Sequence, residues 1–166
     1  MLQWYQDPGA AATVTVGASP FGVAFDGTSI WVANFSSGTV SKINPATNTV
    51  TATVTVGSFP RGVAFDGTSI WAANSGSDTV SKIDPATSIV TATVTVGSVP
   101  RGVAFDGTSI WVANFNSGTV SKINPATNTV TATVTVGTNP GGVAFDGTNL
   151  WVSNAFSDNV SKIIPF

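Results

Sequence analysis

Four aspartates, one in each copy of a repeated sequence block, are the most regular chemical groups in the chain. They lie 40 residues apart, and a ring of carboxylates with this spacing could bind a cation. Each aspartate is followed by glycine, however, and Asp-Gly is a turn dipeptide in which the carboxylate can accept hydrogen bonds from the nearby backbone. We therefore expect a structural role in a hairpin, rather than a metal site, for Asp26, Asp66, Asp106 and Asp146.

The side chains that most often perform acid–base catalysis are absent. The chain contains no histidine, glutamate or cysteine, which removes the commonest general bases, the imidazole and thiolate metal ligands, and disulfide bonds. Catalysis would have to depend on aspartate, lysine, serine, threonine or tyrosine. The sequence thus favours a non-enzymatic protein with no catalytic residue, metal or cofactor. The alternative is an enzyme, in which aspartates and backbone oxygens would hold a metal.

Two further columns of the repeat place a large or a charged side chain on a predicted strand. The tryptophans could stack on sugars, but a tryptophan in the middle of an apolar strand is more typical of packing between sheets. Lysine occurs once per repeat on another strand, so an ion pair with a turn aspartate of a neighbouring repeat is a hypothesis for this column. The two columns are Trp31, Trp71, Trp111 and Trp151, and Lys42, Lys82, Lys122 and Lys162.

The 40-residue period organises nearly the whole chain of 166 residues. Four copies follow one another without an insertion, which indicates a modular repeat array. A non-repeat segment, 1–12, precedes a single repeat domain over 13–166. We divide this domain into the repeats 13–52, 53–92, 93–132 and 133–166.

Charge and hydropathy argue against two classes of partner. The net charge is −2, charged residues make up 8% of the chain, and neither sign forms a run. Nothing therefore indicates binding to nucleic acid or to an anionic membrane. No stretch approaches the roughly 18 apolar residues that a membrane-spanning helix needs. The first residues do not resemble a secretory signal, and the sequence leaves the cellular compartment open.

Each repeat contains four short apolar runs bounded by turn residues, and no run has a helical period. In the first repeat they read GVAF, SIWVAN, TVSKIN and TVTATVTVG. The first two runs are apolar on both faces, which requires a sheet packed on each side, whereas the last alternates and is more polar. Four-stranded sheets stacked radially meet both demands. The predicted fold is therefore all-β, a β-propeller with four-stranded blades.

A specific resemblance supports this prediction. The segment WVANFSSGTVSKINPATNTVTATVTVGSFPRGVAF resembles the bacterial YVTN-type β-propeller repeat and is also similar to virginiamycin B lyase-like propellers. The matching elements are the aromatic-Val-x-Asn strand, Gly-Thr-Val-Ser, the Asn-Pro-Ala-Thr turn and Pro-x-Gly-Val-Ala. The lyase resemblance implies an elimination reaction assisted by histidine and a metal, and this chain cannot supply the histidine. Propellers of this kind serve unrelated functions, so the resemblance predicts the fold and not the activity.

The two ends of the array complement each other. Thr13 to Gly17 has the sequence of an outer strand, and the last repeat stops after its third strand, Asn159 to Ile163. The first segment should therefore complete the last blade, in the same chain or in a neighbour, so that no sheet edge stays open. Related propellers carry more than four blades, so we favour a homodimer of eight blades with exchanged closing strands. A four-bladed monomer and a fragment of a longer propeller are the alternatives.

Sequence variation among the four repeats gathers in two loops. The inter-repeat loop reads ASPFG, SFPRG, SVPRG and TNPGG, and the loop between the second and third strands reads NFSSG, NSGSD, NFNSG and NAFSD. Alternate connections of an up-and-down sheet emerge at the same end, so both loops should lie on one face. Aromatic and arginine side chains, which they contain, are favoured at binding surfaces. Neutral drift of weakly constrained loops is the competing explanation.

We therefore predict a scaffold that presents a variable loop face to an unknown small molecule, glycan or protein. A purely architectural or designed self-assembling propeller is the first alternative. A lyase-like enzyme is the second, which the missing histidine and glutamate disfavour. The predicted ligand-binding residues are Phe21, Phe35, Arg61, Arg101, Phe115, Asn116, Asn139 and Phe156.

Overall fold

A computed structural model describes residues 12–165 of the chain. The non-repeat segment predicted over 1–12 therefore lies outside the described residues except for its last position. The described part consists of strands and their connections, and none of it is a helix long and apolar enough to cross a membrane.

The strands form four antiparallel sheets, which we call blades 1 to 4, and their order within each sheet follows the chain. Blades 1 to 3 have four strands and blade 4 has three, which confirms the predicted all-β fold of four-stranded sheets. Blade 1 contains β1 (Pro20–Phe25), β2 (Ile30–Asn34), β3 (Thr39–Asn44) and β4 (Thr49–Thr55); blade 2 contains β5 (Pro60–Phe65), β6 (Ile70–Asn74), β7 (Thr79–Asp84) and β8 (Ile89–Thr95). Blade 3 contains β9 (Pro100–Phe105), β10 (Ile110–Asn114), β11 (Thr119–Asn124) and β12 (Thr129–Thr135); blade 4 contains β13 (Pro140–Phe145), β14 (Leu150–Asn154) and β15 (Asn159–Ile163).

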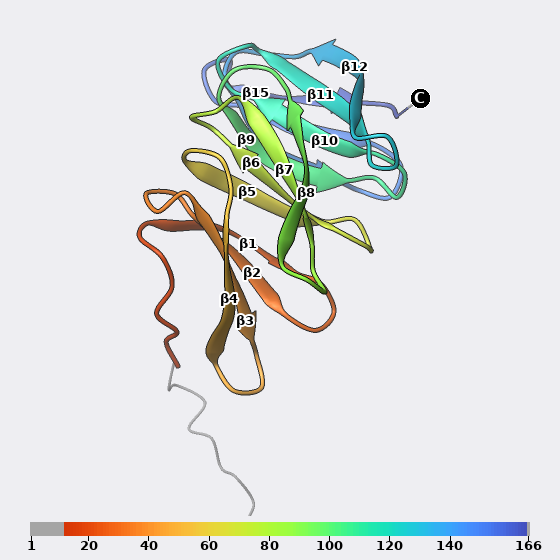
Figure 1. Ribbon diagram of the computed structural model, residues 1–166. Coiled ribbons are helices and arrows are strands. Elements are labelled where there is room, and N and C mark those ends of the chain that lie inside the picture. The colour runs from red at the N-terminus through yellow and green to blue at the C-terminus, as the bar shows by residue number, and fades with distance from the viewer. Residues whose placement is uncertain (1–11, 166) are drawn as a thin grey trace, which may run out of the picture.

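The blades follow one another in a curved stack, with blade 1 at one end and blade 4 at the other (Figure 1). Their first strands lie side by side in chain order, so that β1 contacts β5, β5 contacts β9, and β9 contacts β13. No contact of this extent joins β13 back to β1. The described chain is thus an open arc and not a closed ring of four blades.

Each hairpin between the first and second strands is held by its aspartate, as the sequence predicts. In blade 2, Asp66 Oδ1 accepts hydrogen bonds from the backbone N–H groups of Thr68 at 2.8 Å and Ser69 at 2.6 Å. Its second oxygen accepts a hydrogen bond from the Trp71 indole Nε1 at 2.7 Å. The same indole bond recurs in the other three blades at 2.6–2.7 Å. The carboxylate therefore fixes both the turn and the orientation of the tryptophan.

The electrostatic balance keeps these carboxylates ionised. Burial acts to raise the pKa of Asp66, but hydrogen bonds from the Trp71 indole, Ser69 and Thr68 outweigh it and leave the pKa below its ordinary value. At Asp146, which is exposed, the hydrogen bond from Trp151 is the largest influence and the pKa is far below its ordinary value. At neutral pH the hairpin aspartates are therefore ionised, and their oxygens accept structural hydrogen bonds.

Three tryptophans fill the spaces between blades, which confirms their predicted packing role. Trp31, Trp71 and Trp111 are fully buried. In the first interface Trp31 and Val40 of blade 1 pack with Ile70 and Ile83 of blade 2, and Phe65 packs against this cluster. The next two interfaces repeat the arrangement. Each blade therefore contributes a tryptophan face to the blade that follows and an isoleucine or leucine face to the blade that precedes it.

The direct hydrogen-bond partner of each lysine whose bonds the structure describes is a backbone carbonyl rather than the predicted aspartate. Hydrogen bonds from Ala86 and Thr87 lower the pKa of Asp84 and the charge of Lys42 lowers it further, so the predicted electrostatic interaction between adjacent blades is present at this pair. Lys42 Nζ donates to the backbone carbonyl of Pro85, and Lys82 Nζ to that of Pro125, both at 2.7 Å. Each amine also lies over the tryptophan of its own blade, 5.4 Å and 5.2 Å from the ring centroids. The accepting carbonyl belongs to the turn in which the aspartate was expected, so it can link the two blades in its place. In the turn that Lys82 reaches, position 124 is an asparagine and offers no carboxylate. The lysine still links adjacent blades, as a hydrogen-bond donor.

Glycine allows the innermost strands to approach each other closely. A Cβ added to Gly62 of β5 would collide with the backbone carbonyl of Arg101 on β9, and one added to Gly22 would collide with that of Arg61. At Gly102 the corresponding contact, with the carbonyl of Gly141, would be 2.6 Å. No side chain fits at these three positions, because the obstructing atoms belong to the backbone.

The aspartate contacts predict that Asp66→Ala lowers the free energy of unfolding by about 3 kcal/mol, because a buried indole N–H and two backbone N–H groups lose a charged acceptor. Since the pKa is lowered by folding, the contribution is complete above the unfolded value of about 3.9 and is lost as pH falls through the lowered folded value. Urea unfolding from pH 7 to pH 2 should therefore show the difference from the parent chain shrinking in acid. The control is Asp158→Asn, at a loop position of positive φ that asparagine tolerates, and it should change little. A constant difference at all pH values would contradict this account.

The glycine contacts predict that Gly62→Ala destabilises the stack by about 2 kcal/mol, because two inner strands must move apart. Gly141→Ala is the matched control, since the nearest atom to its added Cβ is Ser153 Oγ at 3.8 Å. Both variants can be compared by thermal unfolding. Equal melting temperatures would mean that the inner strands can separate without cost.

Candidate functional site

The two variable loops lie on one face of the stack, as the order of the strands predicts. Backbone hydrogen bonds join them within each blade: Phe35 N donates to Ser19 O at 2.9 Å, and Phe115 N donates to Val99 O at 3.0 Å. Ser37 and its equivalents add a second link, with the Ala18 N–H donating to Ser37 Oγ at 2.7 Å. We call this surface the variable face.

One cluster of aromatic rings and an arginine joins blades 1 and 2 on the variable face. The Phe35 ring lies 5.3 Å from that of Phe21 and stacks on that of Phe59 at 4.8 Å. The Arg61 guanidinium carbon lies 5.0 Å from the Phe21 ring centroid and 4.7 Å from that of Phe35. The guanidinium thus rests between two rings whose electron-rich faces attract a cation. Phe21 and Phe59 remain about half exposed.

A second cluster joins blades 3 and 4. The Arg101 guanidinium carbon lies 3.2 Å from the centroid of Phe115, and the Phe156 ring meets Phe115 edge-on at 6.3 Å. Asn139 Nδ2 donates to the carbonyl of Phe115 at 3.2 Å. Asn116 follows Phe115 in the same loop and is exposed.

A groove of about 340 Å³ opens beside this second cluster. It lies between the loop after β10 and the connection from β12 to β13, and its volume is within the range of small-molecule sites. Backbone and hydroxyl groups dominate its walls, together with one aromatic ring. It is lined by Phe115, Asn116, Ser117, Gly118, Thr135, Val136, Gly137, Thr138 and Asn139.

The two arginines influence each other electrostatically. Burial lowers the pKa of Arg101, and the positive charge of Arg61 lowers it further, although a guanidinium stays charged at neutral pH. The Nε atoms of both side chains are buried and have no hydrogen-bond partner among the described residues. The variable face thus carries two guanidinium groups, and its loops also contain two carboxylates, those of Asp78 and Asp158. Asp78 Oδ1 accepts a hydrogen bond from the Val99 N–H at 2.8 Å, two residues before Arg101.

The backbone of the inter-blade loop is strained at the edge of this site. The residue before each loop proline has a positive φ, which asparagine tolerates but β-branched and bulky residues do not. In blade 4 this residue is Asn139, with φ 54°, whereas blades 2 and 3 place Phe59 and Val99 there, with φ 55° and 54°. Such strain persists only where the surrounding hydrogen bonds enforce it.

The structure brings seven of the eight predicted site residues into two ring-and-arginine clusters, and Asn116 lines the adjoining groove. Gly141, which takes the place of arginine in blade 4, contributes no side chain. Phe59, which stacks on Phe35, is not among the residues predicted from the sequence. The sequence does show an aromatic residue in a variable loop at this position. Phe59 comes directly before the loop proline, however, and on a regular strand its side chain would point away from Phe35.

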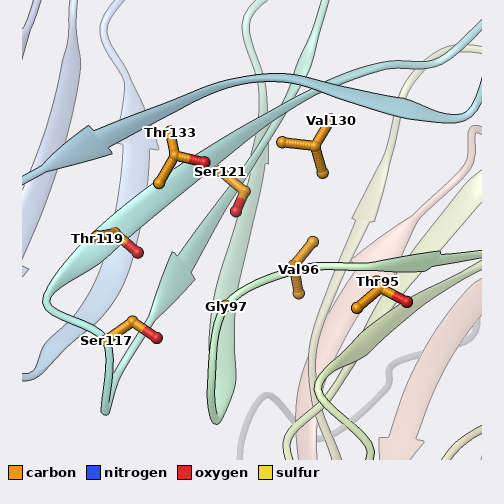
Figure 2. Close-up of a pocket in the computed structure, with 8 residues that line it drawn as sticks. All are labelled: Thr95, Val96, Gly97, Ser117, Thr119, Ser121, Val130 and Thr133. Carbon is orange, nitrogen blue, oxygen red and sulfur yellow. The ribbon is translucent and has the colours of Figure 1, made fainter.

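Another hollow, of about 410 Å³, lies between blades 2 and 3 near their outer strands (Figure 2). Small hydroxyl and apolar side chains line it, and it contains no charged group. Ser121 Oγ already accepts a hydrogen bond from Asn114 Nδ2 at 2.9 Å, so this hydroxyl is used in the structure. The lining residues are Thr95, Val96, Gly97, Ser117, Thr119, Ser121, Val130 and Thr133.

Comparison with known proteins identifies the architecture. No protein-family model matches the chain, and no curated protein matches it in sequence. Among solved structures, hydrazine synthase from Kuenenia stuttgartiensis is 24% identical, with a TM-score of 0.80 over 94% of this chain and 49% of that chain. Catalytically inactive virginiamycin B lyase from Staphylococcus aureus with quinupristin is 13% identical, with a TM-score of 0.78 over 92% of this chain and 54% of that one. The chain has a β-propeller fold.

The lengths of the similar propellers differ. The chain spans about half the length of the hydrazine synthase and lyase chains. The computationally designed Ika4 protein is 12% identical with a TM-score of 0.79, and the match covers 93% of this chain and 96% of that protein. At these identities the likeness establishes the fold alone, which confirms the resemblance to virginiamycin B lyase-like propellers at the level of architecture.

The strained loop predicts that Val99→Asn raises the free energy of unfolding by about 1 kcal/mol, because asparagine accepts the positive φ that valine resists. Blade 4 already has asparagine at this position. Val99→Thr keeps the branch at Cβ and should bring no gain. Urea unfolding compares the two variants, and a less stable Val99→Asn protein would show that burial of the valine side chain outweighs the strain.

Proposed function

We propose that this propeller is a non-enzymatic scaffold that binds a ligand on its variable face. The observation that carries the proposal is the pair of arginines, Arg61 and Arg101, held over phenylalanine rings on adjacent parts of that face. A constant frame of aspartate-held hairpins supports loops whose sequences differ from blade to blade. This arrangement is typical of proteins in which rigid strands position recognition loops.

The chemistry of the face favours a ligand with an anionic group. Guanidinium groups bind carboxylate or sulfate through paired N–H donors, and stacking on phenylalanine orients them for this purpose. The neighbouring groove offers the Phe115 ring and the polar side chains of Asn116 and Asn139 to the remainder of the ligand. A small aromatic carboxylate and an acidic glycan share these features.

The carboxylates support a role in structure rather than in catalysis. Those of the repeated column accept hydrogen bonds from tryptophan and from the backbone, and their pKa values are lowered. A carboxylate with a lowered pKa is a weak general base at neutral pH. This supports a binding role for the chain over a lyase-like reaction.

The proposal predicts that Arg101→Ala weakens binding of an acidic probe by about tenfold or more, because a charge-assisted hydrogen bond contributes about 1.5–3 kcal/mol. The probes are an oligogalacturonate, a neutral galactose oligomer of the same length, and benzoate, each titrated by calorimetry. Arg61→Ala should act in the same direction. Arg101→Lys should recover part of the affinity, since it restores the charge without the planar donor pair.

Asp84→Asn, in a turn on the opposite face, is the matched control and should bind as the parent chain does. Binding of the acidic probes should also weaken with added salt. If neither the oligogalacturonate nor benzoate binds the parent chain, the anion proposal is wrong and the architectural alternative gains. Equal binding of the neutral oligomer would instead place recognition on the rings alone.

A further inference from the structure

Both end faces of the blade stack are apolar and have no partner within the described chain. On blade 4, Trp151 is 40% exposed and Val160 is 57% exposed, whereas the three preceding tryptophans are 0% exposed. On blade 1, Val23 is 61% exposed and Phe25 is 55% exposed. The two faces lie at opposite ends of the arc (Figure 1).

These faces are the two halves of one interface. Inside the stack, the tryptophan face of one blade packs against the isoleucine and phenylalanine face of the next, as Trp31 and Val40 do with Ile70 and Phe65. Blade 4 presents the first half of this interface, with Trp151 and Val160 at the same repeat positions. Blade 1 presents the second half. The exposed side chains of that half are Val23 and Phe25, while Val32 and Ile43, at the equivalent repeat positions, are already buried in blade 1.

The exposed face of blade 4 is hollowed where a neighbouring blade would fit. The hollow measures about 300 Å³ and its walls are mainly apolar. Its one hydroxyl, Ser153, replaces the buried alanines of the other blades, and it accepts a hydrogen bond from the Gly142 N–H at 2.9 Å. This polar group is therefore satisfied within its own blade and could be covered without penalty. The lining residues are Gly142, Val143, Ala144, Trp151, Ser153 and Val160.

An open strand edge lies beside this hollow. In blade 1 the third strand pairs with a fourth, with Val40 opposite Val54 and Ser41 opposite Thr53. In blade 4, β15 pairs with β14 and with no outer strand among the described residues. The segment 13–16 has the sequence TVTV of such an outer strand, yet it is not paired in a sheet. The edge and the unpaired segment lie at opposite ends of the arc.

We propose that a second copy of this chain occupies both ends, so that two arcs close into one ring. Blade 4 of each copy receives blade 1 of the other, and segment 13–16 of each copy adds a fourth strand to β15 of the other. The two seams are related by a two-fold axis, which a closed dimer requires. The ring then has eight blades, and every blade has four strands.

Three observations favour a second copy over an unrelated partner. The complementary residues belong to the same repeat columns that already pack three times inside the chain. The missing strand has the repeat's own sequence. Finally, each copy has one open edge at β15 and one unpaired segment at 13–16 within its described residues, so one copy supplies what the other lacks. The closure is independent of any ligand of the variable face.

The register inside the stack specifies the contacts at each seam. Because Ser41 lies opposite Thr53, Ser161 should lie opposite the partner's Thr13. Likewise, because Lys42 Nζ donates to the carbonyl of Pro85, Lys162 Nζ should donate to the carbonyl of the partner's Pro45. The repeats therefore predict one residue pair and one hydrogen bond at each seam.

The first test is the solution mass of the chain by light scattering after size exclusion. Closure predicts about twice the 16.8 kDa mass of the chain. A monomer would overturn the proposal, and would mean that further blades of a longer chain or another protein cover the ends. A mass of three or more chains would overturn it as well.

Variants of the seam test which surfaces join. Trp151→Ala and Val23→Asp lie on the two halves, and either should weaken the dimer by at least about 30-fold, since a buried anchor residue is lost or a charge is placed in an apolar contact. The matched control is Ile89→Thr, which removes an exposed apolar side chain from an outer strand and installs the residue of Thr49 and Thr129. It should leave the mass unchanged. Circular dichroism should show that the variants keep their sheets, and a folded Trp151→Ala dimer of parental affinity would overturn the seam.

Cross-linking tests the strand exchange directly, because the chain has no cysteine of its own. The double variant Thr13→Cys with Ser161→Cys, treated with a short bismaleimide, should give a covalent dimer on a denaturing gel. The double variant Thr13→Cys with Ile89→Cys is the control and should give none, because β8 lies away from the seam. A cross-linked monomer would show closure within one chain, and the absence of any cross-link would show that the segment does not pair with β15.

Discussion

The hydrogen bond from tryptophan to the hairpin aspartate is the constraint on which the rest of this propeller depends. The carboxylate of Asp66 orders the turn with one oxygen and fixes the Trp71 indole with the other. The indole is then the largest side chain between its blade and the next, and it also lies beneath the Lys82 amine that reaches the following turn. An interaction within one turn thus helps to set the spacing between blades. Without it, the spacing would depend on apolar packing alone, which has no preferred direction.

The repetition of one interface separates the requirements of folding from those of recognition. Strand sequences hardly change because each must fit a neighbour of the same kind, and Gly22, Gly62 and Gly102 hold the inner strands at one distance. The loops of the variable face carry fewer constraints of this type. Their rigidity comes from backbone hydrogen bonds between the paired loops, which hold even Val99 at a positive φ.

The sequence predicted the fold more completely than the site. The 40-residue period, the four apolar runs and the Asp-Gly turns were sufficient for the strands, because each depends on local pattern and on a repeat that must pack against itself. The strand order also placed both variable loops on one face. Which side chains meet there depends on directions that periodicity does not contain. Phe59 reaches its cluster from a backbone position of positive φ, and Lys42 donates its hydrogen bond to the carbonyl of Pro85, next to the aspartate of the same turn.

The unlike ends of the arc have a consequence for assembly beyond the pairing of two chains. When one surface of a molecule binds a different surface of an identical molecule, copies can keep adding to one another. The assembly closes into a ring only if the rotations from each copy to the next add up to a full turn. The curvature between adjacent blades is therefore the feature that decides between a discrete particle and a filament. That curvature is set where β1, β5, β9 and β13 touch at their glycines. A side chain that wedges these strands apart would change the polymer that the protein forms, and not only its stability.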